Sequence, residues 1–215
     1  MRKIVFDFDG TLLNSKKRHE IVLKNIIKEY NLQINREIYD YVDYKNEGGN
    51  TYDYLTKILL LKEEDALRIS KRWITIIEKN EYLQYDKLYD DSVKILGELR
   101  KDYDLKLVSA RKNKQGLYKQ LCNLKILDYF FEIEVVSPVN AKNEKILALE
   151  KDKNQIALIV GDTEVDCDCA YFYQIPFYCL NRGFRSKNYW EKRGIASFDD
   201  LSMIKDVIEK GEKFI

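Results

Sequence analysis

Short apolar runs alternate with longer stretches of helical spacing along most of this 215-residue chain. Runs rich in Val, Ile, Leu and Phe, bounded by polar residues or glycine, are typical of buried β-strands. They predict strands at 3–8, 104–109, 132–136, 156–160 and 175–179, and a weaker sixth strand at 194–198. Apolar spacing predicts helices at 112–127, 143–151 and 164–173, and a terminal helix at 199–211. The alternation indicates an α/β fold of the Rossmann-like type, a parallel sheet with helices on both faces.

The connection between the first two predicted strands is much longer than the others. About 90 residues intervene, where a single crossover helix would suffice. Amphipathic spacing predicts helices at 16–31, 35–45, 50–61 and 63–83, and a helix at 91–101 that returns the chain to the sheet. We therefore expect a core domain of residues 1–14 and 89–215 and a small α-helical cap domain inserted at 15–88, with hinges near 13–16 and 84–90.

The composition is that of a globular protein without a strong charge bias. Hydrophobic residues make up 45% of the chain and charged residues 34%, which allows a sizeable core and a solvated surface. Lys and Arg number 37 against 36 Asp and Glu, so no basic stripe for nucleic acid is indicated. No apolar run reaches the ~18 residues of a membrane helix, and no signal-peptide pattern opens the chain. We expect a cytoplasmic protein without membrane or nucleic-acid partners; no pattern indicates its oligomeric state.

The cysteine and histidine content narrows the possible chemistry. Without a secretory signal, the four cysteines are expected to be reduced thiols. Cys167 and Cys169 have the spacing of half a metal site, but no second Cys/His pair accompanies them, which favours buried apolar roles. His19 is the only histidine and lies in a charged run typical of a solvated helix face. A Ser-His-Asp or Cys-His mechanism is excluded unless His19 is its base.

The most specific motif is Asp7-Phe8-Asp9-Gly10-Thr11, directly after the first predicted strand. It places two carboxylates at the carboxyl edge of the sheet, where open α/β folds keep their reactive groups. The glycine permits a sharp turn that brings the second acid back toward the first. Carboxylates this close repel one another unless a cation lies between them or one holds a proton. Either arrangement is typical of an active site.

Two later strands end in groups that complement these acids. Strand 104–109 ends at Ser109, whose hydroxyl suits a phosphate oxygen beside the N–H groups of a helix start, although a simple helix cap is the alternative. Strand 156–160 is followed by Asp162 and Asp166, whose carboxylates are hard oxygen ligands for Mg²⁺.

A cation from a side chain is also required, because several acids and a phosphate dianion carry more negative charge than one Mg²⁺ offsets. Lys142 is favoured, since it precedes the helix predicted at 143–151 and can reach the strand edge. Lys145 is the competing candidate.

These motifs, in this order, resemble the haloacid dehalogenase superfamily of phosphohydrolases, and the resemblance covers nearly the whole chain. The inserted helices are similar to the small cap of its phosphoglycolate-phosphatase-like and β-phosphoglucomutase-like branch. The resemblance implies that Asp7 is the nucleophile and Asp9 the acid/base, and that Ser109 and Lys142 hold the phosphoryl group. That branch usually has proline after the lysine, where this chain has Asn143.

The resemblance also implies Mg²⁺ as the cofactor. Its ligands would be Asp7, Asp162 and the backbone carbonyl of Asp9, with Asp166 in support. The implied reaction is hydrolysis of a small phosphorylated metabolite through an aspartyl-phosphate. Asp9 favours a phosphatase over a dehalogenase, because dehalogenation has no alkoxide leaving group to protonate.

Two alternatives from different classes stay open at this point. One is a sugar-phosphate mutase of the β-phosphoglucomutase type, and the other is a catalytically silent binding protein on the same fold. Selectivity is expected to reside in the insert, where Gly48, Gly49 and Asn50 interrupt the helices. These residues form either a substrate-specificity loop that faces Asp7 or a plain turn between helices.

Overall fold

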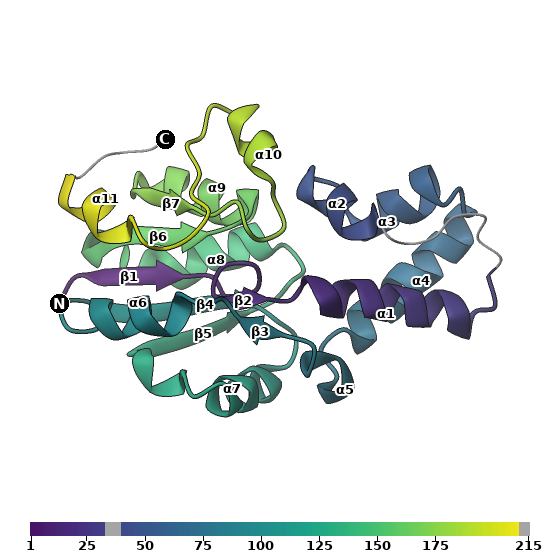
Figure 1. Ribbon diagram of the computed structural model, residues 1–215, viewed down its shortest axis with the longest axis horizontal. Helices are drawn as coiled ribbons and strands as arrows, with labels where there is room; N and C mark the ends of the chain where they lie inside the picture. The colour runs from purple at the N-terminus through teal and green to yellow at the C-terminus, as the bar shows by residue number, and fades with distance from the viewer. Residues whose placement is uncertain (33–39, 211–215) are drawn as a thin grey trace.

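The computed structural model describes residues 1–32 and 40–210, which form an α/β body with a group of helices at one end (Figure 1). Its sheet contains β1 (Lys3–Phe6), β4 (Asp104–Ala110), β5 (Glu132–Val136), β6 (Ile156–Gly161) and β7 (Phe177–Cys179). Neighbouring strands are parallel, in the order β5-β4-β1-β6-β7. The predicted Rossmann-like parallel sheet is confirmed. Because β1 lies at its centre, residues that follow β1 are flanked by the ends of β4 and β6.

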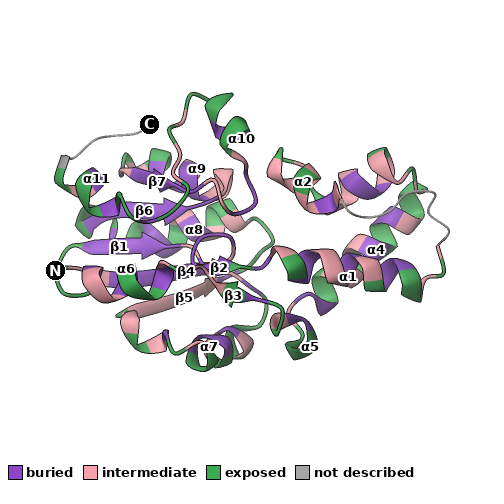
Figure 2. Cartoon of the chain, in the orientation of Figure 1, coloured by how far each residue is buried: buried purple, intermediate pink, exposed green. Residues whose placement is uncertain are grey.

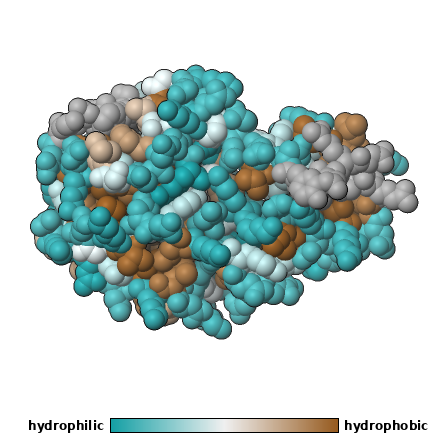
Figure 3. All heavy atoms as spheres, viewed as in Figure 1, coloured by the Kyte–Doolittle hydropathy of each residue, from teal (hydrophilic) through white to brown (hydrophobic). Residues whose placement is uncertain are grey.

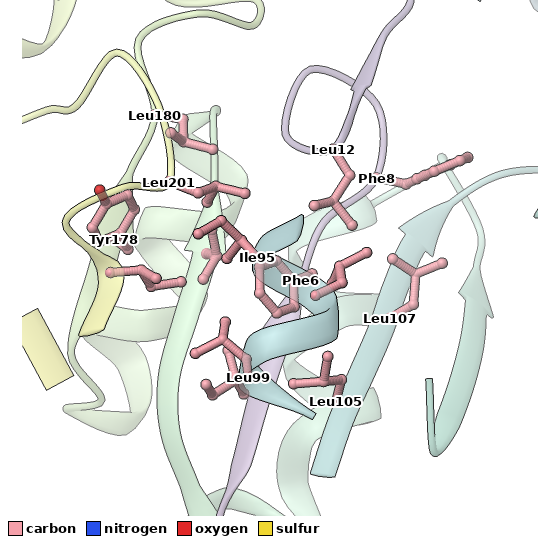
Figure 4. Close-up of a cluster of buried hydrophobic side chains, with 14 of the residues drawn as sticks. Phe6, Phe8, Leu12, Ile95, Leu99, Leu105, Leu107, Tyr178, Leu180 and Leu201 are labelled. Atoms are coloured by element: carbon pink, nitrogen blue, oxygen red, sulfur yellow. The ribbon is translucent and has the colours of Figure 1, made fainter. Parts of the chain in front are cut away.

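Helices cover both faces of this sheet. They are α6 (Ser92–Leu99), α7 (Lys114–Asn123), α8 (Ala141–Glu150), α9 (Glu164–Tyr173), α10 (Lys187–Glu191) and α11 (Ile204–Lys210), with 3₁₀ turns η3 (Leu127–Tyr129) and η4 (Lys153–Gln155). Successive residues of β1 point to opposite faces. Phe6 joins a hydrophobic cluster with α6, α7 and α11, in which Figure 4 shows Ile95 and Leu99 of α6. Val5 joins a second cluster with α8, α9 and α10.

Burial is nearly complete along most strands of the sheet. Every residue of β1 and β6 is buried, and Figure 2 shows both strands in the colour of buried residues. Continuous apolar runs, rather than alternating ones, are what a strand covered on both faces requires. The sheet therefore gives its carboxyl edge a rigid support.

The segment between β1 and α6 forms a helical insert (residues 15–88) with a hydrophobic cluster of its own. Its helices are α1 (Lys16–Glu29), α2 (Tyr41–Asn46), α3 (Thr51–Asp53), the π-helix η2 (Tyr54–Ile58), α4 (Glu63–Ile76) and α5 (Asn80–Leu83). Val22, Ile26 and Leu55 are fully buried in this cluster, which shares no residue with the two clusters of the sheet. At its base, β2 (Leu13–Asn14) pairs antiparallel with β3 (Lys87–Leu88), within the two predicted hinge segments.

Several elements differ from the predicted boundaries. The helix predicted at 63–83 is divided into α4 and α5, and the helix predicted at 50–61 is a short α3 that continues as η2. Of the helix predicted at 35–45, residues 35–39 lie outside the described residues, and α2 begins at Tyr41, with Asp40 as its cap. The weak strand at 194–198 is a single bridge between Leu180 and Phe198, too short for a sheet strand.

The surface agrees with a charged, globular chain. The face in Figure 3 is mainly hydrophilic, with smaller hydrophobic patches between the charged residues. Within residues 1–32 and 40–210, none of the helices has the length and apolarity needed to cross a bilayer. The cysteines are free thiols; Cys167, Cys169 and Cys179 are buried, as expected for apolar roles, whereas Cys122 is exposed.

Candidate active site

Three carboxylates converge at the carboxyl edge of the sheet. Asp7 follows β1, Asp162 follows β6 and Asp166 lies in the first turn of α9, and each offers an oxygen within 4.8 Å of the others. Burial raises the pKa of Asp7 well above its usual range, and Asp166 and Asp162 add to this effect while Lys145 opposes it. Burial, followed by the charge of Asp166, raises the pKa of Asp162 to about 7. The group thus concentrates negative charge that a cation would offset.

Glycine allows the chain to wrap closely round Asp162. Gly10 has φ +86°, and a Cβ there would lie 2.2 Å from the Asp162 Oδ2 atom; a Cβ on Gly183 would lie 2.0 Å from the same atom. Asp162 accepts hydrogen bonds from the Phe184 N–H at 2.6 Å and the Thr11 hydroxyl at 3.2 Å. A side chain at either position would displace the Asp162 carboxylate. This close packing explains why the first motif has glycine at position 10.

Lys145, not Lys142, supplies the cation. Its Nζ lies 2.6 Å from Asp7 Oδ1 and 2.6 Å from Asp166 Oδ1. Burial disfavours the charged ammonium, but Asp166 and Asp7 outweigh it and raise the pKa of Lys145. Lys142 is exposed and pairs with Asp168 at 2.9 Å, so its predicted place at the phosphate is corrected.

The positions of the two lysines along α8 explain this difference. α8 begins at Ala141, earlier than predicted, and Lys145 shares its buried face with Ala148 and Leu149. From this buried face the Lys145 ammonium reaches Asp7 and Asp166. Lys142 lies about one turn earlier, at the start of α8, where its exposed side chain pairs with Asp168 of α9.

Asp166 is oriented by the start of its own helix. Its Oδ2 accepts hydrogen bonds from the Thr163 hydroxyl at 2.8 Å and the Thr163 N–H at 3.3 Å, which is a capping box. Since its other oxygen accepts the bond from Lys145, Asp166 is placed to hold the lysine against Asp7.

Asp9 lies in a closed ring of ion pairs and hydrogen bonds. Its two oxygens accept bonds from Arg18 Nη2 and, at 2.6 Å, from Arg111 Nε. Arg18 Nε is 3.1 Å from Asp86, which accepts a bond from Gln120 at 2.7 Å, and Gln120 in turn accepts one from Arg111 at 3.4 Å. Burial would raise the pKa of Asp9, but Arg111 and Arg18 outweigh it and hold the pKa well below its usual range. The ring links α1 of the insert to α7 and to the loop after β4 in the core.

A cavity of about 300 Å³ opens over these acids, between the insert and the core. Asp7, Asp9 and Lys145 form its floor together with Ser109, which is buried at the carboxyl end of β4 as predicted. The opposite wall comes from α1 and α4 of the insert. The position of Ser109 suits a phosphoryl oxygen bound above Asp7.

The insert is closed onto the core on two sides of this cavity. On one side, Glu78 accepts hydrogen bonds from the N–H groups of Lys112 at 2.9 Å and Asn113 at 2.8 Å. On the other side, the Ser186 N–H donates to the Asn46 carbonyl at 2.9 Å. These contacts hold the described arrangement and enclose the space over Asp7.

A family model for haloacid dehalogenase-like hydrolases matches residues 4–179. The chain belongs to the haloacid dehalogenase-like hydrolase family. Its sequence is 28% identical to the phosphoglycolate phosphatase of Aquifex aeolicus (strain VF5) over 181 residues, which are 79% of this chain and 80% of that protein. The family and this relative support a hydrolase of the phosphatase type.

Solved structures share the fold. A haloacid dehalogenase-like hydrolase from Streptococcus pneumoniae aligns with a TM-score of 0.76 at 19% identity, covering 96% of this chain and 98% of that one. The HAD-hydrolase YfnB from Bacillus subtilis, in a magnesium-bound form, aligns with a TM-score of 0.63 at 15% identity, covering 97% and 98%. These likenesses extend the fold of the family to the insert as well as the sheet.

The loop at Gly48, Gly49 and Asn50 does not take the predicted place in this hydrolase. None of the three lines the cavity, and a Cβ on Gly48 would lie 2.6 Å from the Tyr189 ring. The loop packs beside α10, a short helix that the sequence did not predict. The expectation that this loop faces Asp7 is therefore corrected: the wall over Asp7 comes from α1 and α4.

The charged run around His19 was predicted to be a solvated helix face, but it contains two buried side chains. Arg18 and His19 are buried rather than solvated, with the His19 ring centroid 4.4 Å from that of Phe184 and 5.1 Å from that of Trp73. A signal was present, because Arg18 is four residues before Val22 and thus on the apolar face of α1. Asp86 and Gln120 carried no comparable signal.

Proposed function

We propose that this hydrolase is a Mg²⁺-dependent phosphatase that cleaves a small phosphomonoester through an aspartyl-phosphate on Asp7. The observation that carries the proposal is the group of Asp7, Asp162 and Asp166 with Lys145 bonded to two of its members. Carboxylate oxygens are the ligands that Mg²⁺ prefers. The magnesium-bound state of YfnB, which shares the fold, supports the choice of ion.

Asp7 and Asp162 would hold the ion together with the backbone carbonyl of Asp9, while Asp166 would position Lys145. When bound, Mg²⁺ would offset the charge of the carboxylates and of the phosphoryl oxygens, so that an anionic nucleophile can approach an anion. Ser109 would donate its hydroxyl to a phosphoryl oxygen, and Lys145 would add a second positive charge beside Asp7.

The reaction then proceeds in two steps. An oxygen of Asp7 attacks phosphorus, the bond from phosphorus to the ester oxygen breaks, and Asp9 gives its proton to the departing oxygen. Water next attacks the phosphorus of the aspartyl-phosphate, Asp9 takes a proton from that water, and the bond to Asp7 breaks to release phosphate. The carboxylates of both residues return to their initial states.

The ion pairs of Asp9 bear on both steps. Arg111 and Arg18 favour its ionised form, which is the form that deprotonates water in the second step. The first step requires the proton, so one of these ion pairs must weaken once substrate is bound. A phosphate dianion that competes for Arg18 or Arg111 would have this effect.

The helical insert would act as a cap domain. It contributes Arg18 to the ring around Asp9, and the paired strands β2 and β3 give it two connecting segments that can bend together. Opening would admit substrate, and closure would exclude bulk water from the aspartyl-phosphate.

Metal dependence tests the proposal. Phosphate release from 4-nitrophenyl phosphate and from small alkyl phosphates should require Mg²⁺, stop with a chelator, and return when Mg²⁺ is added in excess. Asp162→Asn should lower release at least a hundredfold at limiting Mg²⁺. Full activity after chelation would contradict the metal assignment, and no release under any condition would contradict the phosphatase.

A further inference from the structure

The wall of the cavity opposite the carboxylates is largely apolar. Trp73, Ile74 and Ile77 of the insert line it together with Val139 and Phe184 of the core. Ile74 is 41% exposed and Val139 is 65% exposed, although both are large apolar side chains at the mouth of an otherwise charged site. Apolar groups that stay exposed beside a catalytic group are a common mark of a binding surface.

Most polar groups on the same wall already have partners within the protein, whereas the buried indole N–H of Trp73 has none. His19 Nδ1 is 2.9 Å from Lys45 Nζ, and both oxygens of Glu78 accept backbone N–H groups. Arg18 is bonded to Asp9 and paired with Asp86. Among the described lining residues outside the carboxylate floor, the side chains left to contact a leaving group are thus mostly apolar.

This arrangement discriminates between leaving groups. A hydroxyl-rich group such as a sugar would lose water on entry and find few free partners, and unpaired buried hydroxyls are costly. An apolar group would replace water on Ile74, Ile77 and Val139 and gain from the removal of apolar surface from solvent. The rings of Trp73 and Phe184 suit a flat group in particular.

We propose that the substrate is a phosphomonoester whose leaving group presents an apolar, ring-bearing or branched surface to this wall, and that Ile74 and Val139 determine this preference. The proposal rests on the proposed phosphatase function and names the substrate class for that same site. It also separates the protein from enzymes that recognise sugar phosphates by hydrogen bonds to hydroxyls.

Two esters of matched geometry test the preference. Benzyl phosphate and glucose 6-phosphate both carry the phosphate on a methylene group attached to a six-membered ring, so they differ mainly in the polarity of that ring. With Mg²⁺ present, we expect kcat/KM to be at least tenfold higher for benzyl phosphate. Equal values, or a preference for glucose 6-phosphate, would overturn the proposal.

Substitutions locate the preference in the wall. Ile74→Asn and Val139→Asn should each reduce the ratio of the two kcat/KM values at least threefold. Leu67→Asn is the matched control, because Leu67 lies on the same helix α4, is 49% exposed and does not line the cavity. An unchanged ratio in both wall variants, or an equal change in the control, would overturn the assignment.

The three esters distinguish a wrong leaving-group class from a wrong phosphatase assignment. Hydrolysis of 4-nitrophenyl phosphate without hydrolysis of either matched ester would overturn the proposed leaving group but keep the phosphatase. Failure to hydrolyse any of the three esters with Mg²⁺ would overturn the phosphatase and the inference with it.

Discussion

At the scale of single residues, the site depends on how buried charges are matched. Asp7, Asp162 and Asp166 are crowded at one sheet edge, and Lys145 is the buried cation that contacts two of them. A buried ion pair that loses one partner leaves an uncompensated charge, which costs far more than the loss of a surface pair. Substitutions at Lys142 and Lys145 should therefore differ sharply in effect.

Lys145→Met should lower kcat at least a hundredfold, because the charge beside Asp7 is lost while the volume of the stem is kept. Lys142→Met, which removes an exposed partner of Asp168, should change kcat less than threefold. Steady-state kinetics on one aryl phosphate suffices, with circular dichroism as the check on folding. The reverse ranking would restore Lys142 to the phosphate.

Lys45 offers a pH test of the packing between insert and core. Burial, followed by the charge of Arg185, lowers the pKa of Lys45 to about 7. In the unfolded chain this lysine titrates near its ordinary value of 10.5. As the pH falls from that value to about 7, the unfolded state binds a proton that the folded state does not, so stability falls in this window.

Lys45→Met should therefore be more stable than the wild type at pH 7, by about 1–3 kcal/mol. Urea denaturation at several values between pH 7 and pH 10 should show this gap shrink as the pH rises, because the wild-type penalty disappears. A gap that is constant over the window would contradict the lowered pKa.

At the scale of elements, the ring around Asp9 joins parts of the chain that are distant in sequence. Arg18 comes from α1, Arg111 from the loop after β4, Gln120 from α7, and Asp86 from the segment before β3. Burial raises the pKa of Asp86 to about 6, although Arg18 opposes the change. Asp86 is thus placed to hold Arg18, and through Gln120 also Arg111, in position around Asp9.

Asp86→Asn should loosen Asp9 without removing it. We expect kcat to fall at least tenfold for an alkyl phosphate, whose leaving oxygen requires a proton, and less than threefold for 4-nitrophenyl phosphate. The matched control is Asp152→Asn, which removes a buried carboxylate paired with Lys3 and Lys106. The control should lower stability and leave the ratio of the two rates unchanged; an equal shift in both variants would contradict a positioning role.

The sequence predicted the elements better than their side-chain connections. The strands and the acids that follow them were predictable, because a short continuous apolar run followed by Asp7 or Asp162 is typical of a buried strand that ends at an active site. The ring around Asp9 was not predictable, since Asp86 and Gln120 belong to no motif. These two residues meet only because α7 packs beside the segment before β3. The short α10 was also missed, because five residues are too few to show helical periodicity.

At the scale of the whole molecule, the chain joins a rigid sheet to a helical insert with a separate hydrophobic cluster. The insert was predictable from its length and spacing. The part of the insert that faces Asp7 could not be predicted, because it depends on how α1 and α4 pack over the sheet. The loop with the two glycines packs beside α10 instead. A ligand held at the sheet edge should stabilise the folded chain as a unit.

Mg²⁺ should raise the melting temperature, because it binds the folded carboxylates and has no comparable site in the unfolded chain. Binding at a hundredfold excess over its dissociation constant contributes about 2.7 kcal/mol. Differential scanning calorimetry with Mg²⁺ and with KCl of equal ionic strength separates this effect from salt screening. An equal shift with both salts, or an undiminished Mg²⁺ shift in Asp162→Asn, would count against the metal site.

The most direct test of the central claim is a search for the phosphoryl group on Asp7. The wild-type protein, mixed with an aryl phosphate and Mg²⁺ and quenched with acid within milliseconds, should yield one phosphorylated peptide, the one that contains Asp7, by mass spectrometry. Asp7→Asn should yield none and release no phosphate, while remaining folded. Phosphate release by the wild type with no phosphorylated peptide at any quench time, together with activity in Asp7→Asn within tenfold of wild type, would contradict the account.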